Sequence, residues 1–332
     1  MVLQDSYGRQ FSYLRLSITD ACNFRCVYCL PNGYRKTTSE QPLTVNEIEN
    51  LCSALSEMGM WKVRLTGGEP TLRHDLIEIT QCLSQIPGIR KIALSTNGYR
   101  LEQLARSLKE AGVSRINVSI DSLDRQRFKE ITGRDFLVQI LGGIEKSLEL
   151  GISEIKVNAV LLMGSAEKQD EWIQKELSLF LDWIRKSPIT VRLIELMPTG
   201  KNSEIFKKHH RSSHGIREWL LEAGWIPQSR SEGNGPAVEF EHPHYQGKIG
   251  IIAPYSKDFC ASCNRLRVTS TGGLRLCLFG EGNYPLRPLL QERAQKEELK
   301  ALFRTVLQQK ERSHYLPEGR YGNNQTFSAM GG

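Results

Sequence analysis

The sequence predicts an α/β fold: an incomplete (β/α)6 barrel of the TIM-like kind, followed by a small C-terminal region. Six short runs rich in β-branched residues alternate with longer amphipathic segments between residues 13 and 197, a pattern that favours a parallel sheet covered by helices. Six units suit a curved or partial barrel better than a closed barrel of eight. A doubly wound sheet is the alternative, but no G-x-G-x-x-G stretch follows the first run, which argues against the dinucleotide-binding form of that fold.

The expected strands and helices follow one another in a regular order. The strands are residues 13–19, 61–66, 90–96, 115–120, 155–162 and 190–196. Apolar residues recur with the helical period in the segments between them, at residues 44–59, 101–112, 137–151 and 171–186. Three of these segments end on a glycine just before the next strand, where a helix C-cap belongs. These glycines are Gly59, Gly112 and Gly151.

The pattern changes after residue 200. Residues 201–215 are polar and basic, and residues 229–248 are rich in turn-forming residues. One further helix is expected within residues 291–312. We therefore expect two parts, a barrel in residues 1–228 and a smaller C-terminal region in residues 229–332.

The composition is that of an ordinary globular protein, with 39% hydrophobic and 24% charged residues. The net charge of +7 favours an anionic partner, although charge alone does not distinguish a nucleotide, a nucleic acid and a membrane surface. No apolar run reaches the ~18 residues of a membrane helix, and the N-terminal stretch lacks a secretory pattern. We therefore expect a cytoplasmic protein whose eight cysteines are ligands or buried thiols rather than disulfides. Cys52 and Cys82 fall in helical patterns and are expected to be buried.

Three cysteines crowd together directly after the first expected strand. Cys22, Cys26 and Cys29 have the spacing C-x3-C-x2-C. Four thiolates would close a tetrahedral zinc site, and a cubane iron–sulfur cluster also normally takes four. Three cysteines on a cubane leave one iron open to an outside ligand. The alternative is a zinc site completed by a distant histidine such as His74.

This arrangement resembles the radical S-adenosylmethionine (SAM) enzymes, which carry the same spacing after the first barrel strand and an aromatic residue before the last cysteine. The resemblance implies a radical SAM barrel, and a [4Fe-4S] cluster whose open iron binds SAM and splits it to a 5′-deoxyadenosyl radical. Further matches stand where expected strands end, in 66-TGGEP-70, 95-STNG-98, 117-NVSIDS-122 and 193-LIELMPTG-200. Glycines permit close backbone approach to a ligand, although 66-TGGEP-70 alone is also compatible with a simple tight turn. By resemblance, the SAM contacts are Tyr28, Gly68, Ser119 and Met197.

A second set of three cysteines lies in 260-CASCNRLRVTSTGGLRLC-277. These residues are Cys260, Cys263 and Cys277. One interpretation is a zinc ribbon completed by His242 or His244. The other is a second three-cysteine cubane whose open iron faces a substrate.

The segment C-x2-C-N-R-x-R with a later cysteine resembles one branch of the radical SAM family, the GTP 3′,8-cyclases that open molybdenum-cofactor biosynthesis. The resemblance covers nearly the whole chain. It implies that the second [4Fe-4S] cluster binds the guanine of GTP and that the final Gly331 and Gly332 reach into the active site and support cyclisation. Arginine suits a triphosphate because its planar, permanently charged fork pairs with phosphate oxygens, whereas solvated surface charge is the alternative for each position alone. The implied GTP contacts are Arg15, Arg64, Ser95, Lys156, Arg265 and Arg267.

The resemblance also implies a reaction. The radical removes hydrogen from C3′ of GTP, the ribosyl radical attacks C8 of guanine, and an electron and a proton complete (8S)-3′,8-cyclo-7,8-dihydroguanosine 5′-triphosphate. A reductant is therefore implied as a partner. The enzyme implied to take the product is cyclic pyranopterin monophosphate synthase. Neither nucleic acid nor membrane is expected as a partner, and the sequence leaves the oligomeric state open, with a homodimer among the alternatives.

Two other functions compete with this one. Another radical SAM enzyme with an auxiliary cluster, such as a peptide-modifying one, would share the first triplet and the glycine motif, although those enzymes usually carry a longer ladder of C-terminal cysteines. A zinc protein that binds nucleic acid through its charge of +7 is the other. Iron content and colour would separate these alternatives.

Overall fold

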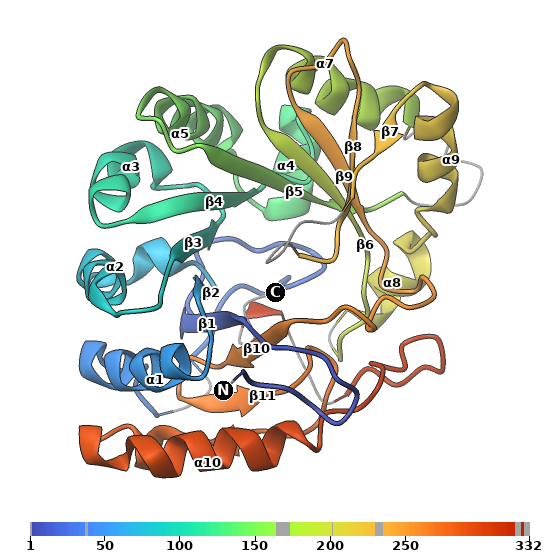
Figure 1. The fold of residues 1–332 in the computed structure, drawn as a ribbon. Coiled ribbons are helices and arrows are strands. Elements are labelled where there is room, and N and C mark those ends of the chain that lie inside the picture. The colour runs from blue at the N-terminus through green and yellow to red at the C-terminus, as the bar shows by residue number, and fades with distance from the viewer. Residues whose placement is uncertain are drawn as a thin grey trace.

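The protein is built on one mixed sheet with helices along one of its faces (Figure 1). The computed structural model describes residues 2–36, 39–163, 173–200, 202–229, 235–322 and 327–328. The strands of the first part are β1 (Tyr13–Thr19), β2 (Lys62–Gly67), β3 (Lys91–Thr96), β4 (Val113–Ser119), β5 (Glu154–Leu161) and β6 (Thr190–Glu195). The later strands are β7 (Ile226–Pro227), β8 (Val238–Glu241), β9 (Lys248–Ile252), β10 (Arg265–Val268), β11 (Gly273–Arg275) and β12 (Tyr284–Pro285).

All six predicted strands are present, within a few residues of their expected bounds. Each of β1 to β6 pairs in parallel with the next. The order across the sheet is β12-β11-β10-β1-β2-β3-β4-β5-β6-β9-β8-β7. The predicted α/β class with a mostly parallel sheet is therefore confirmed.

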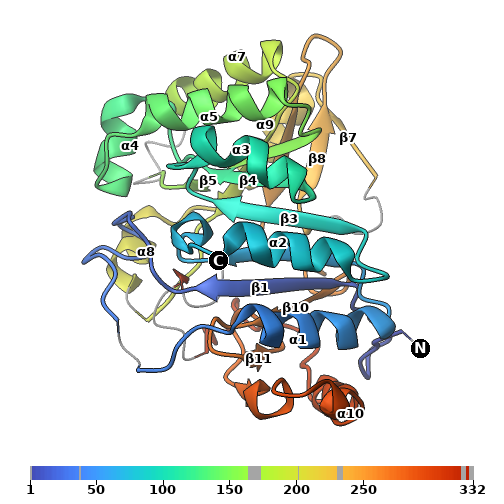
Figure 2. The same ribbon diagram turned by 90° about the vertical axis from the view of Figure 1, so that its left-hand side faces the viewer.

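The helices α1, α2 and α3 lie side by side along the sheet (Figure 2). The helices of the first part are α1 (Val45–Glu57), α2 (Leu76–Gln85), α3 (Leu101–Glu110), α4 (Arg125–Thr132), α5 (Leu137–Glu149) and α7 (Ser178–Lys186). Those of the later part are α8 (Ser203–His209), α9 (His214–Glu222) and α10 (Lys296–Leu307). All four expected helices of the first part are confirmed, and the described part of the fourth begins with a π-helical turn, Ile173–Leu177, that leads into α7. The predicted capping glycines have positive φ angles of 88°, 106° and 77°.

Side-chain alternation divides the two faces of the sheet. In β1, Leu14, Leu16 and Ile18 are completely buried in the hydrophobic core. The residues between them point to the opposite face, because successive side chains of a strand alternate. Arg15 is one of these, and its partner in β2 is Arg64. One face of the sheet therefore packs on the helices, and the other presents polar and charged groups to a shared interior.

The C-terminal part extends both edges of the same sheet. Strand β9 pairs in parallel with β6, and β10 pairs in parallel with β1. Residues 253–264 connect β9 to β10, so this segment runs from one edge of the parallel strands to the other and brings Cys260 and Cys263 with it. The sequence did not indicate these two strands, because runs of five and four residues are too short to show a period. The division at residues 228 and 229 stays a prediction.

Candidate active site

The first three cysteines lie in the loop that follows β1, where the parallel strands end. The Val27 amide donates to the carbonyl oxygen of Ile131 (2.9 Å), which fastens the middle of this loop to α4. The three thiols line a pocket that we call the rim pocket, together with the four predicted SAM contacts. Gly68 follows β2, Ser119 ends β4 and Met197 lies two residues beyond β6. The structure therefore brings Cys22, Cys26, Cys29, Tyr28, Gly68, Ser119 and Met197 to one place.

Burial is the largest influence on the pKa of each of the three thiols in the rim pocket. Burial raises the pKa of Cys22 to about 11 and that of Cys29 to about 12. Burial, followed by the charges of Asp121 and the other two cysteines, raises the pKa of Cys26 well above its usual value. Bound iron would stabilise all three thiolates. The donor set therefore fits a [4Fe-4S] cluster held by three cysteines.

The backbone at Gly68 passes directly against the start of the cysteine loop. The Gly68 amide donates to the Thr19 carbonyl oxygen (2.8 Å), and the next amide, of Glu69, donates to the Ala21 carbonyl oxygen (2.7 Å). A Cβ atom at Gly68 would lie 2.3 Å from that Ala21 oxygen. Only glycine allows this approach. The close approach that the structure shows at Gly68 is to the chain immediately before Cys22, and the predicted contact with SAM stays a prediction.

Two buried carboxylates that the sequence analysis did not single out hold the rim pocket together. Glu69 is completely buried and accepts hydrogen bonds from the Thr96 hydroxyl (2.7 Å) and the Asn97 amide (2.6 Å). Asp121 accepts from the Tyr28 hydroxyl (2.9 Å) on one oxygen and from a backbone amide of β5 (2.8 Å) on the other. Burial raises the pKa of Asp121 to about 6. These hydrogen-bond partners come together only in the folded chain. Both acids nevertheless lie inside motifs quoted above, Glu69 in 66-TGGEP-70 and Asp121 in 117-NVSIDS-122.

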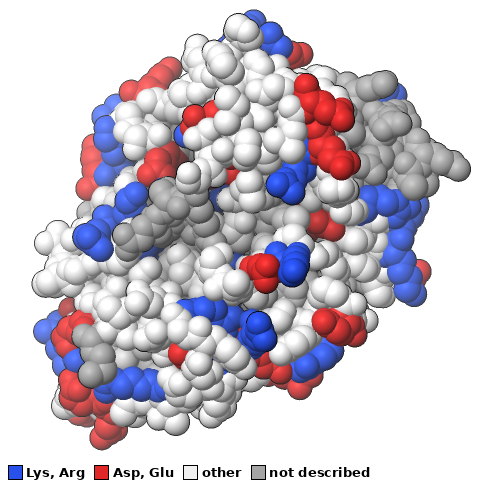
Figure 3. Space-filling model, turned by 45° about the vertical axis from the view of Figure 1, so that its right-hand side comes forward, with Lys and Arg blue, Asp and Glu red and all other residues white. Residues whose placement is uncertain are grey.

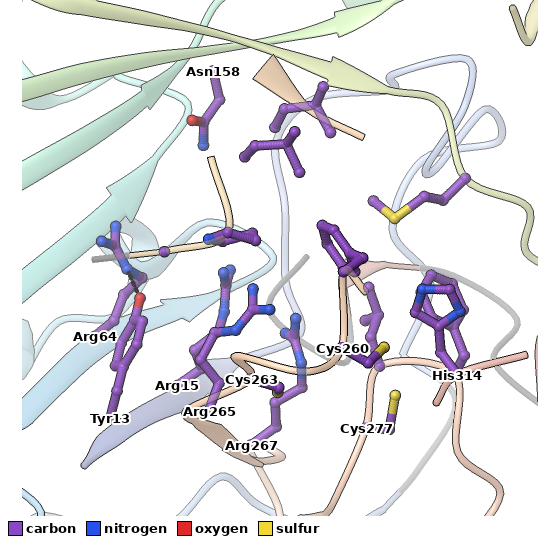
Figure 4. Close-up of a pocket in the computed structure, with 18 of the residues that line it drawn as sticks. Tyr13, Arg15, Arg64, Asn158, Cys260, Cys263, Arg265, Arg267, Cys277 and His314 are labelled. Carbon is purple, nitrogen blue, oxygen red and sulfur yellow. Dashed lines mark hydrogen bonds between the residues drawn. The ribbon is translucent and has the colours of Figure 1, made fainter. Parts of the chain in front are cut away.

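A second pocket lies toward the amino ends of the same strands, and we call it the arginine pocket (Figure 4). In register, Arg15 of β1 stands between Arg64 of β2 and Arg267 of β10. Figure 4 shows Arg15, Arg265 and Arg267 beside the second set of cysteines, with Arg64 farther away next to Tyr13. The structure therefore brings together Arg15, Arg64, Arg265, Arg267, Cys260, Cys263 and Cys277.

The arginine pocket concentrates buried positive charge. Burial and repulsion from Arg64 lower the pKa of Arg192 to about 9, and burial and repulsion from Arg265 lower the pKa of Arg267 to about 10. The Nε atom of Arg192 and the amide oxygen of Asn158 are buried with no hydrogen-bond partner within the described part of the chain. Buried cations and unsatisfied polar atoms are costly. A bound polyanion would neutralise the cations and accept a hydrogen bond from Nε of Arg192, whereas the amide oxygen of Asn158 requires a donor.

One cysteine of the second set, Cys263, differs electrostatically from the first set, whereas burial raises the pKa of Cys260 as it does there. Burial raises the pKa of Cys263, but Arg265 and Lys310 outweigh it and bring the pKa to about 7. A thiol of low pKa in a cationic setting is a ready metal ligand. Within the described ranges, no three His, Cys, Asp or Glu side chains are grouped around a position for a single metal ion. The proposed zinc ligand His242 packs against Trp225, with ring centroids 5.3 Å apart.

Two predicted GTP contacts lie elsewhere. Ser95 lines the rim pocket, but its hydroxyl accepts a hydrogen bond from Arg64 (3.1 Å), which connects it to the arginine pocket. Lys156 does not line the arginine pocket; its ammonium group forms an ion pair with Glu239 in an adjoining hollow.

Besides Lys310, three cations on the strands of the arginine pocket were missed by the sequence analysis. They are Lys62, Arg115 and Arg192. The signal was available, because each is a charged residue inside a β-branched run, as Arg15 and Arg64 are.

The two pockets share part of their walls. Asn158 and Ile194, on neighbouring strands, and Met197 line both of them. Each pocket encloses about 1080 Å³, including space open to solvent. A ligand in one pocket can therefore meet a ligand in the other across this shared wall.

Two residues near the C-terminus come close to the first set of cysteines. Phe327 and Ser328 line the rim pocket, and their backbone amides lower the pKa of Cys29 against the larger effect of burial. Gly331 and Gly332, predicted to act in the active site, lie outside the described residues.

Charges of both signs are interspersed over the surface shown in Figure 3. No helix within the described ranges is both long and apolar enough to cross a membrane.

Comparisons with known proteins agree with the geometry. Residues 16–175 match the family model described as the radical SAM superfamily, and residues 189–316 match the model described as Molybdenum Cofactor Synthesis C. A GTP 3′,8-cyclase of Cronobacter sakazakii is 48% identical over 332 residues, covering 99% of both chains. The chain belongs to the GTP 3′,8-cyclase family. A second GTP 3′,8-cyclase, of Yersinia pestis, is 48% identical over 330 residues, again covering 99% of both chains.

Solved structures support the fold of this cyclase family member. The Streptococcus suis protein SuiB bound to S-adenosylmethionine superimposes with a TM-score of 0.61 at 12% identity, covering 90% of this chain and 68% of that one. The predicted membership of the radical SAM superfamily and of its GTP 3′,8-cyclase branch is therefore confirmed.

Proposed function

We propose that this protein converts GTP to (8S)-3′,8-cyclo-7,8-dihydroguanosine 5′-triphosphate, a lyase reaction that is the first step of molybdenum-cofactor biosynthesis. One observation carries the proposal: a pocket lined by buried arginines and one cysteine triplet shares a wall with a pocket lined by the other triplet. Membership of the GTP 3′,8-cyclase family supports the same reaction.

The radical SAM family implies one [4Fe-4S] cluster and SAM. We propose that Cys22, Cys26 and Cys29 hold this cluster, and that the SAM contacts are Tyr28, Gly68, Ser119 and Met197. When bound, the cluster and SAM supply the 5′-deoxyadenosyl radical that removes the C3′ hydrogen atom of GTP. The proposal includes a second [4Fe-4S] cluster, on Cys260, Cys263 and Cys277.

The residues of the chain bind and orient the substrate. Arginines of neighbouring strands present several N–H donors to one space, which suits the oxygens of a triphosphate. The proposed contacts are Arg15, Arg64, Ser95, Lys156, Arg265 and Arg267. Holding the triphosphate there fixes the ribose near the shared wall, and orientation of this kind contributes much of the rate in such reactions. We propose that Gly331 and Gly332 support the cyclisation step, consistent with Phe327 and Ser328 lining the rim pocket.

The remaining features are also proposals. Residues 1–228 would form the incomplete (β/α)6 barrel and residues 229–332 the region of the second cluster. The partners would be a reductant and, for the product, cyclic pyranopterin monophosphate synthase, in the cytoplasm.

The test is anaerobic incubation of the reconstituted protein with GTP, SAM and dithionite. We expect 5′-deoxyadenosine together with the 3′,8-cyclised nucleotide, and no 5′-deoxyadenosine above background when ATP replaces GTP. Equal turnover of ATP would refute the assignment of guanine to the second triplet. The reconstituted protein should be brown and hold about eight irons per chain, the content of two cubanes; four irons would refute the second cluster.

A further inference from the structure

An ion pair lies beneath the arginine pocket, in a hollow that we call the floor hollow. Its lining includes Arg115, Glu154, Lys156, Glu239, Glu241 and Lys248. The ammonium group of Lys156 in β5 contacts the carboxylate of Glu239 in β8, and these side chains are only 8% and 18% exposed. Arg115 lines both the floor hollow and the arginine pocket, so the two spaces adjoin.

Glu239 reaches toward the arginine pocket across a glycine. Gly250 of β9 lies between Arg192 of β6 and Glu239 of β8 in register. A Cβ atom at Gly250 would lie 3.0 Å from Cγ of Arg192 and 3.4 Å from Cγ of Glu239. Both side chains therefore pass over the same bare stretch of backbone, which brings the carboxylate next to a pocket of cations.

The electrostatic effect of Glu239 extends to three cations. Its charge favours the protonated forms of Lys156, Arg115 and Arg192, opposing the larger effect of burial on the pKa of each. The other two acids of the floor hollow have different partners: Glu154 pairs with Arg115, and Glu241 pairs with Lys248. Of these three acids, Glu239 is the one that neutralises a proposed GTP contact.

We propose that Glu239 is an internal counter-anion that the terminal phosphate of GTP displaces from Lys156. The inference rests on the proposed function, because it assumes that GTP binds in the arginine pocket. In the empty protein Glu239 keeps Lys156 charged and ordered. When GTP binds, Lys156 exchanges a carboxylate for phosphate oxygens, and Glu239 is left close to the incoming anion. Glu239 is therefore a residue that limits the affinity for GTP.

A carboxylate next to Lys156 has a second chemically reasonable role, which would change the affinity for GTP in the opposite direction. A carboxylate that orients Lys156 toward the phosphate would strengthen GTP binding, and its removal would weaken it. A counter-anion weakens GTP binding, and its removal strengthens it. One substitution therefore separates the two roles.

The experiment measures the dissociation constant of GTP for the reconstituted, anaerobic protein by calorimetry. We expect Glu239→Gln to tighten GTP binding at least tenfold, the effect of one unit charge about 12 Å away in a medium with an effective dielectric constant of about 20. Glu241→Gln, two residues along the same strand, is the matched control and should change the value by less than about twofold. The affinity for GDP, which lacks the terminal phosphate, should rise less than that for GTP.

Combining Glu239→Gln with Lys156→Met tests whether Glu239 changes the affinity for GTP through Lys156. In that background Glu239→Gln should change the affinity for GTP far less than in the wild type. Glu239→Val, which suits a strand and removes the same charge, provides a second variant if the glutamine protein does not fold. If Glu239→Gln and Glu239→Val both leave the affinity for GTP unchanged or weaken it, the inference about Glu239 is wrong, and the proposed function is not affected. A wild-type protein that binds SAM but not GTP would overturn the proposed function, and this inference with it.

Discussion

Replacing Gly68 by alanine inserts one methyl group where the structure has no room for it. The new Cβ atom would lie 2.3 Å from the Ala21 carbonyl oxygen and 2.5 Å from that of Asp20. Real Cβ atoms essentially never come within 3.0 Å of such atoms, so the Ala21 carbonyl must move by at least 0.7 Å. The next residue is Cys22, and its sulfur would move with the backbone.

The expected cost has two components. Overpacking of this kind destabilises a protein by about 1–3 kcal/mol, and the hydrogen bonds from the Gly68 and Glu69 amides to this loop would be strained as well. A displacement approaching 1 Å at a reacting centre can cost about 100-fold in rate. We therefore expect Gly68→Ala to fold, to melt at a lower temperature, and to produce 5′-deoxyadenosine about 100-fold more slowly.

Three measurements test this expectation: the melting temperature by circular dichroism, the dissociation constant of SAM, and the rate of 5′-deoxyadenosine formation. Gly142→Ala in α5 is the matched control. A Cβ atom there has its nearest neighbour at 3.8 Å, an ordinary contact, and alanine favours a helix over glycine by up to about 1 kcal/mol. It should melt at a higher temperature and cleave SAM normally. If Gly68→Ala binds and cleaves SAM like the wild type, the argument from close approach is wrong.

Four further predictions follow from the two pockets. Arg267→Ala should weaken GTP binding about 10- to 100-fold, because it removes charge-assisted hydrogen bonds, while the calorimetric affinity for SAM stays unchanged; equal loss of both would contradict the assignment. Burial lowers the pKa of Lys156 to about 8, and a bound phosphate raises this pKa again, so GTP affinity should fall as the pH rises from 7.5 to 9. Lys156→Met should flatten this pH profile. The remaining slope would come from Lys62, whose pKa is lowered by burial to about 7. Asp121→Asn should weaken SAM binding and lower the melting temperature, because an amide cannot accept at both of the positions where the carboxylate does. Cys263→Ala should lower the iron content from about eight to about four per chain and leave the electron paramagnetic resonance signal of the first cluster; loss of all iron would contradict two independent sites.

The sequence was informative wherever the signal is local. A charged residue inside a β-branched run, such as Arg15 or Arg64, stands out from its neighbours alone, and the resemblance implied a GTP contact at both positions. The cysteine spacing and the two glycines at residues 67 and 68 are equally local, because a ligand loop and a close approach each require particular residues at adjacent positions. Comparison with the structure shows these residues in the rim and arginine pockets.

What the sequence could not predict depends on pairing between distant segments. Strands β9 and β10 are short, and nothing within them indicates that they pair with β6 and β1 at opposite edges of the sheet. The partners of Glu69 and Asp121 come from other strands. Lys156 shows this limit most clearly: resemblance implied a GTP contact there, but its pairing with Glu239 is set by the order β5-β6-β9-β8.

The relation between the two pockets follows from the geometry of the strands. Along β2, Arg64 lines the arginine pocket, whereas Thr66, and Gly68 just after the strand, line the rim pocket. Along β4, Arg115 lines the arginine pocket and Ser119 the rim pocket. Four residues of a strand span about 13 Å, so each strand presents a cation at one level and a small or polar group at another, on the same face. A nucleotide whose phosphates bind in the arginine pocket therefore has its ribose near the rim pocket, where SAM is proposed to bind.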